Sequence, residues 1–418
     1  MLELRRPDAS LSGFATSSHF QTTEPMKPLQ NITVVTLEHA IAAPFATRQL
    51  ADLGARVIKI ERPGVGDFAR GYDERVRGLA SHFVWTNRSK ESLTLDLKHP
   101  LAAEVLRRLV QDRADVLVQN LAPGAAERLG LSYAAMSATK PELIVCDISG
   151  YGADGPYRDK KAYDLLIQSE AGFVSVTGSE EVPAKAGNSI ADIAAGMYAY
   201  SNILAALLER QQTGRGRQID VSMLESLVEW MGFPMYYAFE GAAPPSRSGA
   251  SHATIYPYGP FPAGDGATVM LGLQNEREWA LFCEQVLLQP ALAQDPRFAS
   301  NSARSAGRAD LRRIIVECFA TLSAQQVLQR LDAAQIANAQ VNTMAEVWAH
   351  PQLRARRRWT EVDTAAGPVP ALLPPGQDAQ DQARMDPVPA LGQHSDRILA
   401  ELGYSSAEIA GLRAAGAV

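Results

Sequence analysis

Cysteine and histidine are scarce in this chain. Its three cysteines, Cys146, Cys283 and Cys318, lie far apart in the sequence and form no C-x-x-C pair. This usage argues against a disulfide framework and a structural zinc site, and we expect a reducing, cytoplasmic location. None of the seven histidines stands at metal-ligand spacing, so we expect no metal site.

Long apolar runs and a strong excess of basic charge are also missing. No apolar run approaches the length of a membrane span, so we expect no membrane partner. The formal net charge of −6 argues against nucleic acid or an anionic membrane surface as the main partner. The first 25 residues are rich in Ser, Thr and Arg and lack the apolar segment of a secretory signal, so we interpret 1–25 as a disordered leader.

Two common enzyme motifs are absent. The chain has no G-x-S-x-G elbow, which excludes an ordinary serine hydrolase. Gly64-Val65-Gly66 follows a second strand and no helix clearly opens after it, so it does not match the dinucleotide-binding fingerprint.

Alternating strand and helix patterns dominate the first half of the chain. Residues 32–37 indicate a buried strand, 45–53 a helix and 56–61 the next strand, which together are typical of a parallel βαβ unit. Further strands are predicted at 92–97, 115–120, 143–148 and 218–221, with helices between them. Ligands of open α/β sheets bind beyond the carboxyl ends of the strands, where this chain carries His39, Arg62, Lys98 and Asn120.

The second half predicts a smaller unit. A Pro-rich linker near 242–246 is followed by a strand at 268–273 and helices near 276–287, 310–322 and 324–336. Residues 364–389, rich in Ala, Pro, Gly and Gln, predict an extended loop, and two short helices are expected at 395–402 and 406–414. We therefore expect an α/β fold with an open, Rossmann-like parallel sheet in a large domain (26–225), a linker (226–248), a small α+β domain (249–345), and a return segment (346–418) that completes the large domain.

The long apolar segment that begins at Ser189 and ends at Gly214 predicts a buried helix with Asp192 in its first turn. An aspartate at this place has two interpretations. It is either a helix cap, which is the commoner role, or a reactive carboxylate whose pKa is raised by burial and lowered by the helix dipole. On position alone, the capping role is favoured.

Four basic residues, Arg62, Lys98, Arg128 and Lys161, are scattered through the large unit, three of them at turns that follow core elements. Each by itself fits ordinary solvated surface charge. If several converge on one crevice, they form an anion site suited to the phosphates of a nucleotide-bearing ligand.

Short motifs occur in a fixed order along the chain. They are Ala43-Pro44, 53–55, 58–64, 87–90, 95–98, Asn120 with Pro123-Gly124, 128–130, 150–152, Gly178, Asp192, 213–216 and 391–396. In this order they resemble the class III CoA-transferases, the CaiB–BaiF group that includes formyl-CoA transferase and carnitine CoA-transferase. The resemblance covers residue 26 to the C-terminus.

The resemblance implies a set of site residues. The family's catalytic aspartate falls on Asp192, and its CoA-contacting positions fall on His39, Ile41, Ala42, Arg62, Leu95, Lys98, Asn120, Leu121, Arg128, Lys161 and Tyr163. It implies a CoA thioester as substrate and no permanently bound cofactor. The chain departs from the family at Ile41, where a glutamine is usual, and at 248–254, which replaces the glycine-rich lid of formyl-CoA transferase.

The resemblance also implies an interlocked homodimer, in which two ring-shaped subunits thread through one another. The implied reaction moves CoA from an acyl-CoA to an acid through an acyl-aspartyl anhydride on Asp192. The segments 68–72 and 162–166 look like the branch that uses dicarboxylates. We therefore expect succinyl-CoA as donor and itaconate, mesaconate, citramalate, malate or glutarate as acceptor. The candidate contacts for the second carboxylate are Arg48, Arg70, Arg75, Arg77 and His252.

Two alternatives stay open at this point. A 2-methylacyl-CoA racemase shares the fold, but its chemistry needs a His–Asp pair and the histidine position is Tyr163 here. A CoA-binding regulatory protein without turnover is the second alternative, and the presence of Asp192 argues against it.

Overall fold

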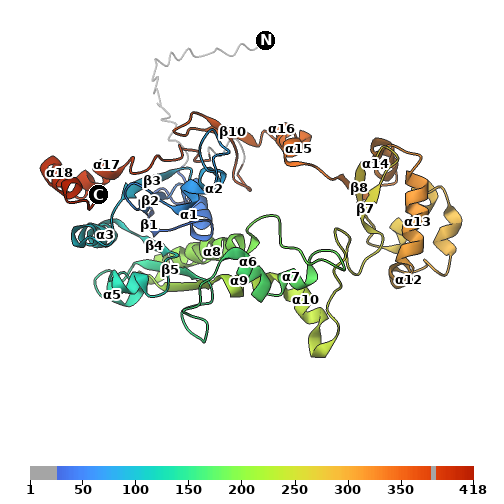
Figure 1. Ribbon diagram of the computed structural model, residues 1–418, viewed down its shortest axis with the longest axis horizontal. Coiled ribbons are helices and arrows are strands. Elements are labelled where there is room, and N and C mark those ends of the chain that lie inside the picture. Colours follow the sequence, from blue (N-terminus) through green and yellow to red (C-terminus); the bar gives the residue numbers. More distant parts are fainter. Residues whose placement is uncertain (1–25, 378–382) are drawn as a thin grey trace, which may run out of the picture.

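A six-stranded parallel sheet forms the centre of the larger unit (Figure 1). The computed structural model describes residues 26–377 and 383–418, so the predicted leader lies outside the described residues. The sheet has the order β3-β2-β1-β4-β5-β6. Its strands are β1 (Thr33–Leu37), β2 (Arg56–Glu61), β3 (Lys90–Thr94), β4 (Val116–Gln119), β5 (Ile144–Ser149) and β6 (Gln218–Ser222).

Alternating side chains of these strands enter two separate apolar layers. Val34 and Val57 face one side, whereas their neighbours Val35 and Ile58 face the other, and all four are fully buried. Such two-sided burial is the reason why the strands read as nearly continuous apolar runs.

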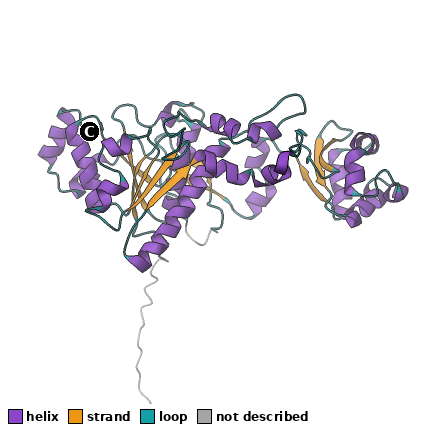
Figure 2. Cartoon of the chain, turned by 90° about the horizontal axis from the view of Figure 1, so that it is seen from below, coloured by secondary structure: helices purple, strands orange, loops and turns teal. Residues whose placement is uncertain are grey.

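Helices cover both faces of the sheet (Figure 2). One face packs against α1 (Ala42–Asp52), α6 (Asp164–Glu170), α8 (Ile190–Thr213) and α9 (Met223–Trp230). The other face packs against α3 (Pro100–Arg113), α5 (Tyr133–Ser137), α17 (Ser395–Glu401) and α18 (Ser406–Ala414). The predicted open sheet with helices on its two faces is confirmed.

The helix α8 is the longest of the described residues and lies directly against α1. Gly196 permits this approach, because a Cβ atom at this position would lie 2.7 Å from the Ala42 carbonyl oxygen and 3.0 Å from the Phe45 ring. By length and composition alone α8 could cross a membrane, which sequence reading did not anticipate. The face of α8 that carries mainly small apolar residues is instead packed in the core on one side of the sheet.

The C-terminal segment returns to the large unit and completes its core. The backbone N–H of His394 donates to the Ser92 carbonyl (3.0 Å), and the Ser92 N–H donates to the His394 Nδ1 (3.1 Å). Ile398 and Leu399 of α17 are buried in the same apolar layer as Leu93 of β3. Residues about 300 positions later in the chain therefore cover β3, which is an edge strand of the sheet.

The smaller unit lies apart from the sheet, on the side marked by α12, α13 and α14 in Figure 1. Its antiparallel sheet consists of β7 (Tyr258–Pro262), β8 (Thr268–Gly272) and β9 (Ala337–Gln340). The helices α11 (Glu276–Leu281), α12 (Asn301–Ala306), α13 (Arg308–Phe319) and α14 (Ala324–Ala333) accompany it. Trp279, Phe282 and Phe319 are fully buried in its own apolar core.

Two expectations about local structure need correction. Residues 364–389 are not all extended loop, because β11 (Val369–Leu372) pairs antiparallel with β10 (Trp359–Val362) and the hairpin buries Val362 and Val369. The predicted strand at 92–97 is shifted, since β3 begins at Lys90, whose side chain is buried by ion pairing rather than by apolarity.

The remaining short elements connect these parts. They are η1 (Phe68–Gly71), α2 (Ser81–Thr86), α4 (Ala125–Arg128), α7 (Phe173–Val176), α10 (Gly232–Tyr237), η2 (Phe239–Gly241), η3 (Phe282–Val286), η4 (Pro290–Gln294), α15 (Met344–Trp348) and α16 (Pro351–Ala355).

Candidate active site

The strand order places a topological switch point at the carboxyl ends of β1 and β4, which we call the switch-point crevice. Chain connections run outward in opposite directions from these two neighbours, and such a switch point is where doubly wound sheets bind ligands. The loops that leave the two strands are tied together. His39 N donates to the Asn120 Oδ1 (2.9 Å), and Asn120 Nδ2 donates to the His39 carbonyl oxygen (2.9 Å).

Most of the positions implied for CoA contact follow this edge of the sheet. His39 follows β1, Arg62 follows β2, Leu95 and Lys98 follow β3, and Asn120, Leu121 and Arg128 follow β4. The charged side chains of Arg62, Lys98, Arg128 and Lys161 are exposed, and so is Tyr163, whereas Ile41, Ala42 and Leu95 are buried. The strand topology therefore brings separated cations to one rim, as an anion site requires.

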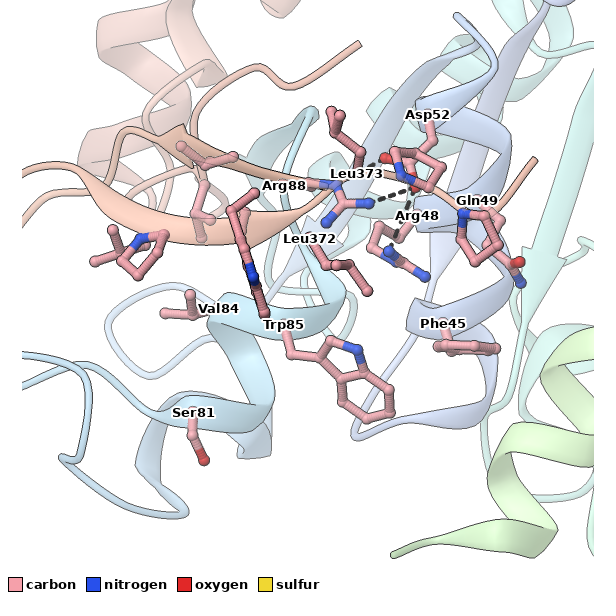
Figure 3. Close-up of a pocket in the computed structure, with 18 of the residues that line it drawn as sticks. Phe45, Arg48, Gln49, Asp52, Ser81, Val84, Trp85, Arg88, Leu372 and Leu373 are labelled. Atoms are coloured by element: carbon pink, nitrogen blue, oxygen red, sulfur yellow. Dashed lines mark hydrogen bonds and ion pairs between the residues drawn. The ribbon is translucent and has the colours of Figure 1, made fainter. Parts of the chain in front are cut away.

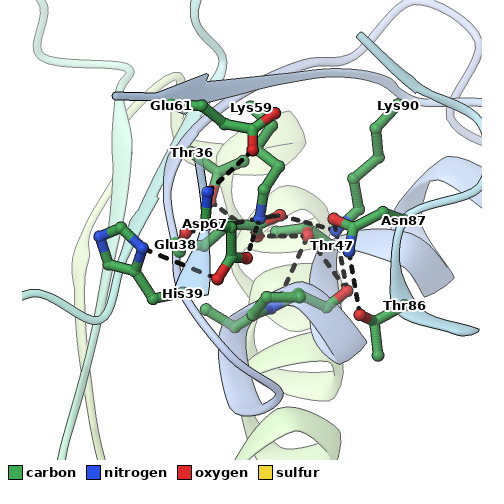
Figure 4. Close-up of polar contacts among 12 residues, drawn as sticks. Thr36, Glu38, His39, Thr47, Lys59, Glu61, Asp67, Thr86, Asn87 and Lys90 are labelled. Carbon is green, nitrogen blue, oxygen red and sulfur yellow. Dashed lines mark hydrogen bonds and ion pairs between the residues drawn. The ribbon is translucent and has the colours of Figure 1, made fainter. Parts of the chain in front are cut away.

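A buried set of ions lies directly beneath this rim (Figure 4). Lys59 pairs with Glu38 (3.2 Å) and with Asp67 (2.7 Å), and Lys90 pairs with Glu38 (2.6 Å). All four side chains have no exposed surface. Burial acts to raise the pKa of Glu38, but the ammonium groups of Lys59 and Lys90 outweigh it and lower that pKa to about 2.

Asp192 is the third residue of α8, and it does not cap the helix. Asp164, the first residue of α6, takes that role: its Oδ1 accepts from the backbone N–H groups of Ala191 (2.8 Å) and Asp192 (3.3 Å). Ser189, at the N-cap position, makes no side-chain capping bond. The capping interpretation of Asp192 is therefore wrong, and its carboxylate is free for another role.

The environment of Asp192 makes its ionisation costly. Burial, and to a smaller extent the negative charge of Asp164, together raise the pKa of Asp192 to about 7. A carboxylate that is ionised in such a place is poorly solvated, so it is a stronger nucleophile than an aspartate in water.

Sequence reasoning missed two residues of this site. Asp164 was noted only as part of the 162–166 segment, and its capping role depends on a helix that begins 26 residues later. Tyr72, which follows η1, is the second, and it too was noted only as part of a segment, 68–72. Burial raises the pKa of Tyr72, and the negative charges of Asp67 and Asp192 act in the same direction.

The cations considered for a second substrate carboxylate differ in availability. Arg48 pairs with Asp52 (3.3 Å) and is buried, and Arg70 makes two bonds of 2.8 Å to Glu61. The charge of Arg70 is already neutralised, which argues against direct substrate binding, whereas Arg48 shares the single carboxylate of Asp52 with Arg88. Arg75 and Arg77 are exposed. His252 lies in the smaller unit, where its Nδ1 accepts from the N–H groups of Thr254 (3.2 Å) and Ile255 (3.1 Å).

A cavity of about 960 Å³ opens between α1, α2, α8 and the β10–β11 hairpin (Figure 3). Trp85, Trp348 and Trp359 contribute to its largely apolar lining, and Arg48 and Arg88 meet over Asp52 in its wall. Asp192 does not line it, although Met197 and Tyr200, further along α8, do. This cavity is therefore separate from the candidate reactive carboxylate.

The segment that replaces the family's glycine-rich lid contacts the loop that leads towards α8. Gly249 N–H donates to the Gly178 carbonyl oxygen (2.7 Å). The Arg247 guanidinium donates to the carbonyl oxygens of Ser179 (2.9 Å) and Glu180 (2.7 Å).

Among the described residues, no group of three or more His, Cys, Asp or Glu side chains is placed to hold a metal ion.

The raised pKa gives a stability prediction for Asp192→Asn. The folded wild type holds the proton up to about pH 7, whereas the unfolded chain releases it near the ordinary value of 3.8. Wild-type stability is therefore lost as the pH rises from about 4 to 7. We expect the thermal midpoint of Asp192→Asn to exceed that of the wild type by a margin that widens over this range and levels off above it.

Thermal unfolding of both proteins between pH 4 and 9 measures this margin. Asp154→Asn, at an exposed loop position, is the matched control and should show no widening. A constant margin for Asp192→Asn across the range would contradict the assigned environment.

Comparison with known proteins agrees with the resemblance over nearly the whole chain. A family model described as CoA-transferase family III matches residues 29–395. A succinate–glutarate CoA-transferase of Agrobacterium fabrum is 35% identical over 90% of this chain and 96% of its own length. The human succinyl-CoA:glutarate CoA-transferase is 32% identical over 94% of this chain and 90% of its own length.

Further relatives carry other acids in their names. A succinyl-CoA–D-citramalate CoA-transferase of Chloroflexus aurantiacus is 32% identical over 93% of this chain and 98% of its own length. Among solved structures, a CaiB/BaiF family protein from Brucella suis superposes with a TM-score of 0.79 at 34% identity, covering 90% of this chain and 99% of that one. The chain therefore belongs to CoA-transferase family III, the CaiB–BaiF group, and is a CoA-transferase.

Proposed function

We propose that the enzyme transfers CoA from succinyl-CoA to a second dicarboxylic acid through anhydrides formed on Asp192. The observation that carries this proposal is the local geometry of Asp192. Asp164 accepts from two N–H groups at the start of α8, and the Asp192 carboxylate, in a poorly solvated position, accepts no hydrogen bond within residues 26–377 and 383–418. The names of the relatives support the donor and the class of acceptor.

In the first step, a carboxylate oxygen of Asp192 attacks the thioester carbonyl of succinyl-CoA. The C–S bond breaks, CoA leaves as the thiolate, and a succinyl-aspartyl anhydride remains. Because an anhydride keeps the activation of the thioester, no further energy source is required. The reaction needs Asp192 in its ionised form, and its pKa of about 7 makes that form well populated at neutral pH.

CoA is then passed to the acceptor through three further attacks on carbonyl groups. The thiolate attacks the aspartyl carbonyl, which releases succinate and leaves an aspartyl-CoA thioester. A carboxylate of the acceptor attacks this thioester to give a mixed anhydride, and the thiolate finally attacks the acceptor carbonyl. The acceptor leaves as its CoA thioester and Asp192 is regenerated, with water excluded so that the anhydrides are not hydrolysed.

The switch-point crevice is our proposed site for the CoA body. The exposed cations Arg62, Lys98, Arg128 and Lys161 suit its phosphates, and binding energy gained there holds the thioester in line with the carboxylate. We propose a C5 dicarboxylate such as itaconate as acceptor. Ile41 gives an apolar surface near the crevice, and of the predicted cations Arg75, Arg77 and His252 carry no carboxylate partner in the described residues.

We also propose an interlocked homodimer in the cytoplasm. In one chain, Phe233, Met235, Tyr236 and Phe239 of α10 and η2 are more than half exposed, and the Trp-lined cavity is open. Apolar surface of this extent is typical of a face that a partner covers. All three cysteines are free, which fits a reducing compartment.

The acceptor is tested by turnover with succinyl-CoA and a panel of acids, read by mass spectrometry of the CoA products. We expect C5 dicarboxylates to give CoA thioesters at rates at least about tenfold above those of monocarboxylates, which corresponds to about 1.4 kcal/mol of transition-state binding by the second carboxylate. Selective use of formate or carnitine would show that the acceptor class is wrong.

The assembly is tested by light scattering on the eluting protein. The mass should be twice the 45.1 kDa of the chain and should not fall on dilution, because threaded rings separate only after unfolding. A monomeric mass, or a dimer that dissociates rapidly at low concentration, would contradict the interlocked arrangement.

A further inference from the structure

The turn between β1 and α1 has an unusual backbone. Ala40 has a φ of 61°, which is the left-handed region that non-glycine residues rarely adopt. Its backbone N–H donates to the Asp67 Oδ1 (3.0 Å), and the same oxygen accepts from the Ala69 N–H (2.9 Å). One buried carboxylate oxygen therefore holds the strained turn and the start of η1 together.

Lys59 fixes this carboxylate from the other side. Its Nζ lies 2.7 Å from the Asp67 Oδ2 and 3.2 Å from the Glu38 Oε1 (Figure 4). Glu38 directly precedes the turn, so one ammonium group binds both the residue before the turn and the carboxylate that holds it. The Glu38 Oε2 also accepts from the hydroxyl of Thr47 in α1 (2.6 Å).

Lys90 completes the set and ties it to the first residues of α1. Its Nζ donates to the Glu38 Oε1 (2.6 Å) and to the Pro44 carbonyl oxygen (3.0 Å). The four side chains are two cations and two anions without exposed surface. This balance lets them remain charged in the core, and removal of one member leaves an unpaired buried charge.

The segment Gly64-Val65-Gly66-Asp67, which does not match a dinucleotide fingerprint, has a clear geometric role here. At Gly66, φ is 69° and a Cβ atom would lie 2.9 Å from the Glu61 Oε1 and 2.8 Å from the Arg70 Cδ. Only glycine fits this turn, and the turn directs Asp67 back beneath the end of β1. The motif delivers a carboxylate to the core rather than amides to a phosphate.

We propose that Asp67, held by Lys59, is a positioning residue for the CoA thioester. It acts through the Ala40 turn, which sets His39 and Ile41 at the mouth of the switch-point crevice. The His39 ring lies 4.8 Å from the Phe68 ring, and the Arg62 guanidinium lies 4.8 Å from the same ring, so the turn, η1 and Arg62 form one wall. The inference rests on the proposed function, because it takes this crevice as the CoA site.

Calorimetric titration of the full-length protein with CoA tests the proposal. Asp67→Asn keeps the side-chain volume but loses the charge that pairs with Lys59, and an amide that turns its oxygen towards Lys59 presents its NH₂ group to the Ala40 N–H. We expect its dissociation constant for CoA to rise about tenfold or more, with KM for the thioester raised more than kcat is lowered. Asp52→Asn is the matched control. It also removes a fully paired buried carboxylate, bonded to Arg88 (2.8 Å) at the far end of α1, and should lower stability without changing CoA affinity.

Two variants of Ala40 separate positioning from simple core stability. Glycine adopts a positive φ freely, so Asp67→Asn with Ala40→Gly should recover much of the lost affinity. Ala40→Val, which leaves the ions untouched, should weaken CoA binding by itself, because a β-branched residue resists this conformation.

Each result has a definite meaning. Wild-type affinity in Asp67→Asn, or in Ala40→Val if Asp67→Asn fails to fold, would overturn the positioning role and leave the proposed function intact. Loss of affinity in Asp67→Asn without recovery in the Ala40→Gly background would also overturn it, in favour of a purely structural role. Failure of the wild type to bind CoA would contradict both the inference and the proposed function.

Discussion

The capping bond from Asp164 to the start of α8 is the interaction on which the active site depends. Free N–H groups at a helix start attract the nearest carboxylate, and Asp192, in the first turn, is the obvious candidate. Asp164 arrives from another helix and takes those N–H groups first. The Asp192 carboxylate then has a raised pKa and accepts no hydrogen bond from the part of the chain that the structure describes, a condition that suits the proposed carboxylate nucleophile.

The sheet supplies the rest of the site by topology. Its strand order creates a switch point between β1 and β4, and the parallel arrangement brings cations from distant segments to the same edge. The buried ions lie below that edge, where Asp67 accepts from the backbone N–H of Ala40 and lies 3.8 Å from the His39 Nδ1. The chemistry and the binding surface are thus organised by two separate sets of buried carboxylates, one around α8 and one under β1.

Much of this arrangement was predictable from the residues, because it depends on periodicity and order. The strand and helix alternation predicted the parallel sheet, and the ordered motifs predicted the family, which the comparisons confirm. What was missed depends on contacts between distant residues. The capping by Asp164, the pairing of Arg70 with Glu61 and the pairing of β11 with β10 each require a partner whose position no local pattern reveals.

Trapping of the covalent intermediate tests the central claim most directly. The protein is mixed with succinyl-CoA in the presence of hydroxylamine, digested, and mapped by mass spectrometry, with Asp192→Asn treated in parallel. The account predicts a hydroxamate at residue 192 of the wild type that requires succinyl-CoA, and neither adduct nor transfer in Asp192→Asn. An unmodified Asp192 in an enzyme that still transfers CoA, or full transfer by Asp192→Asn, would contradict it.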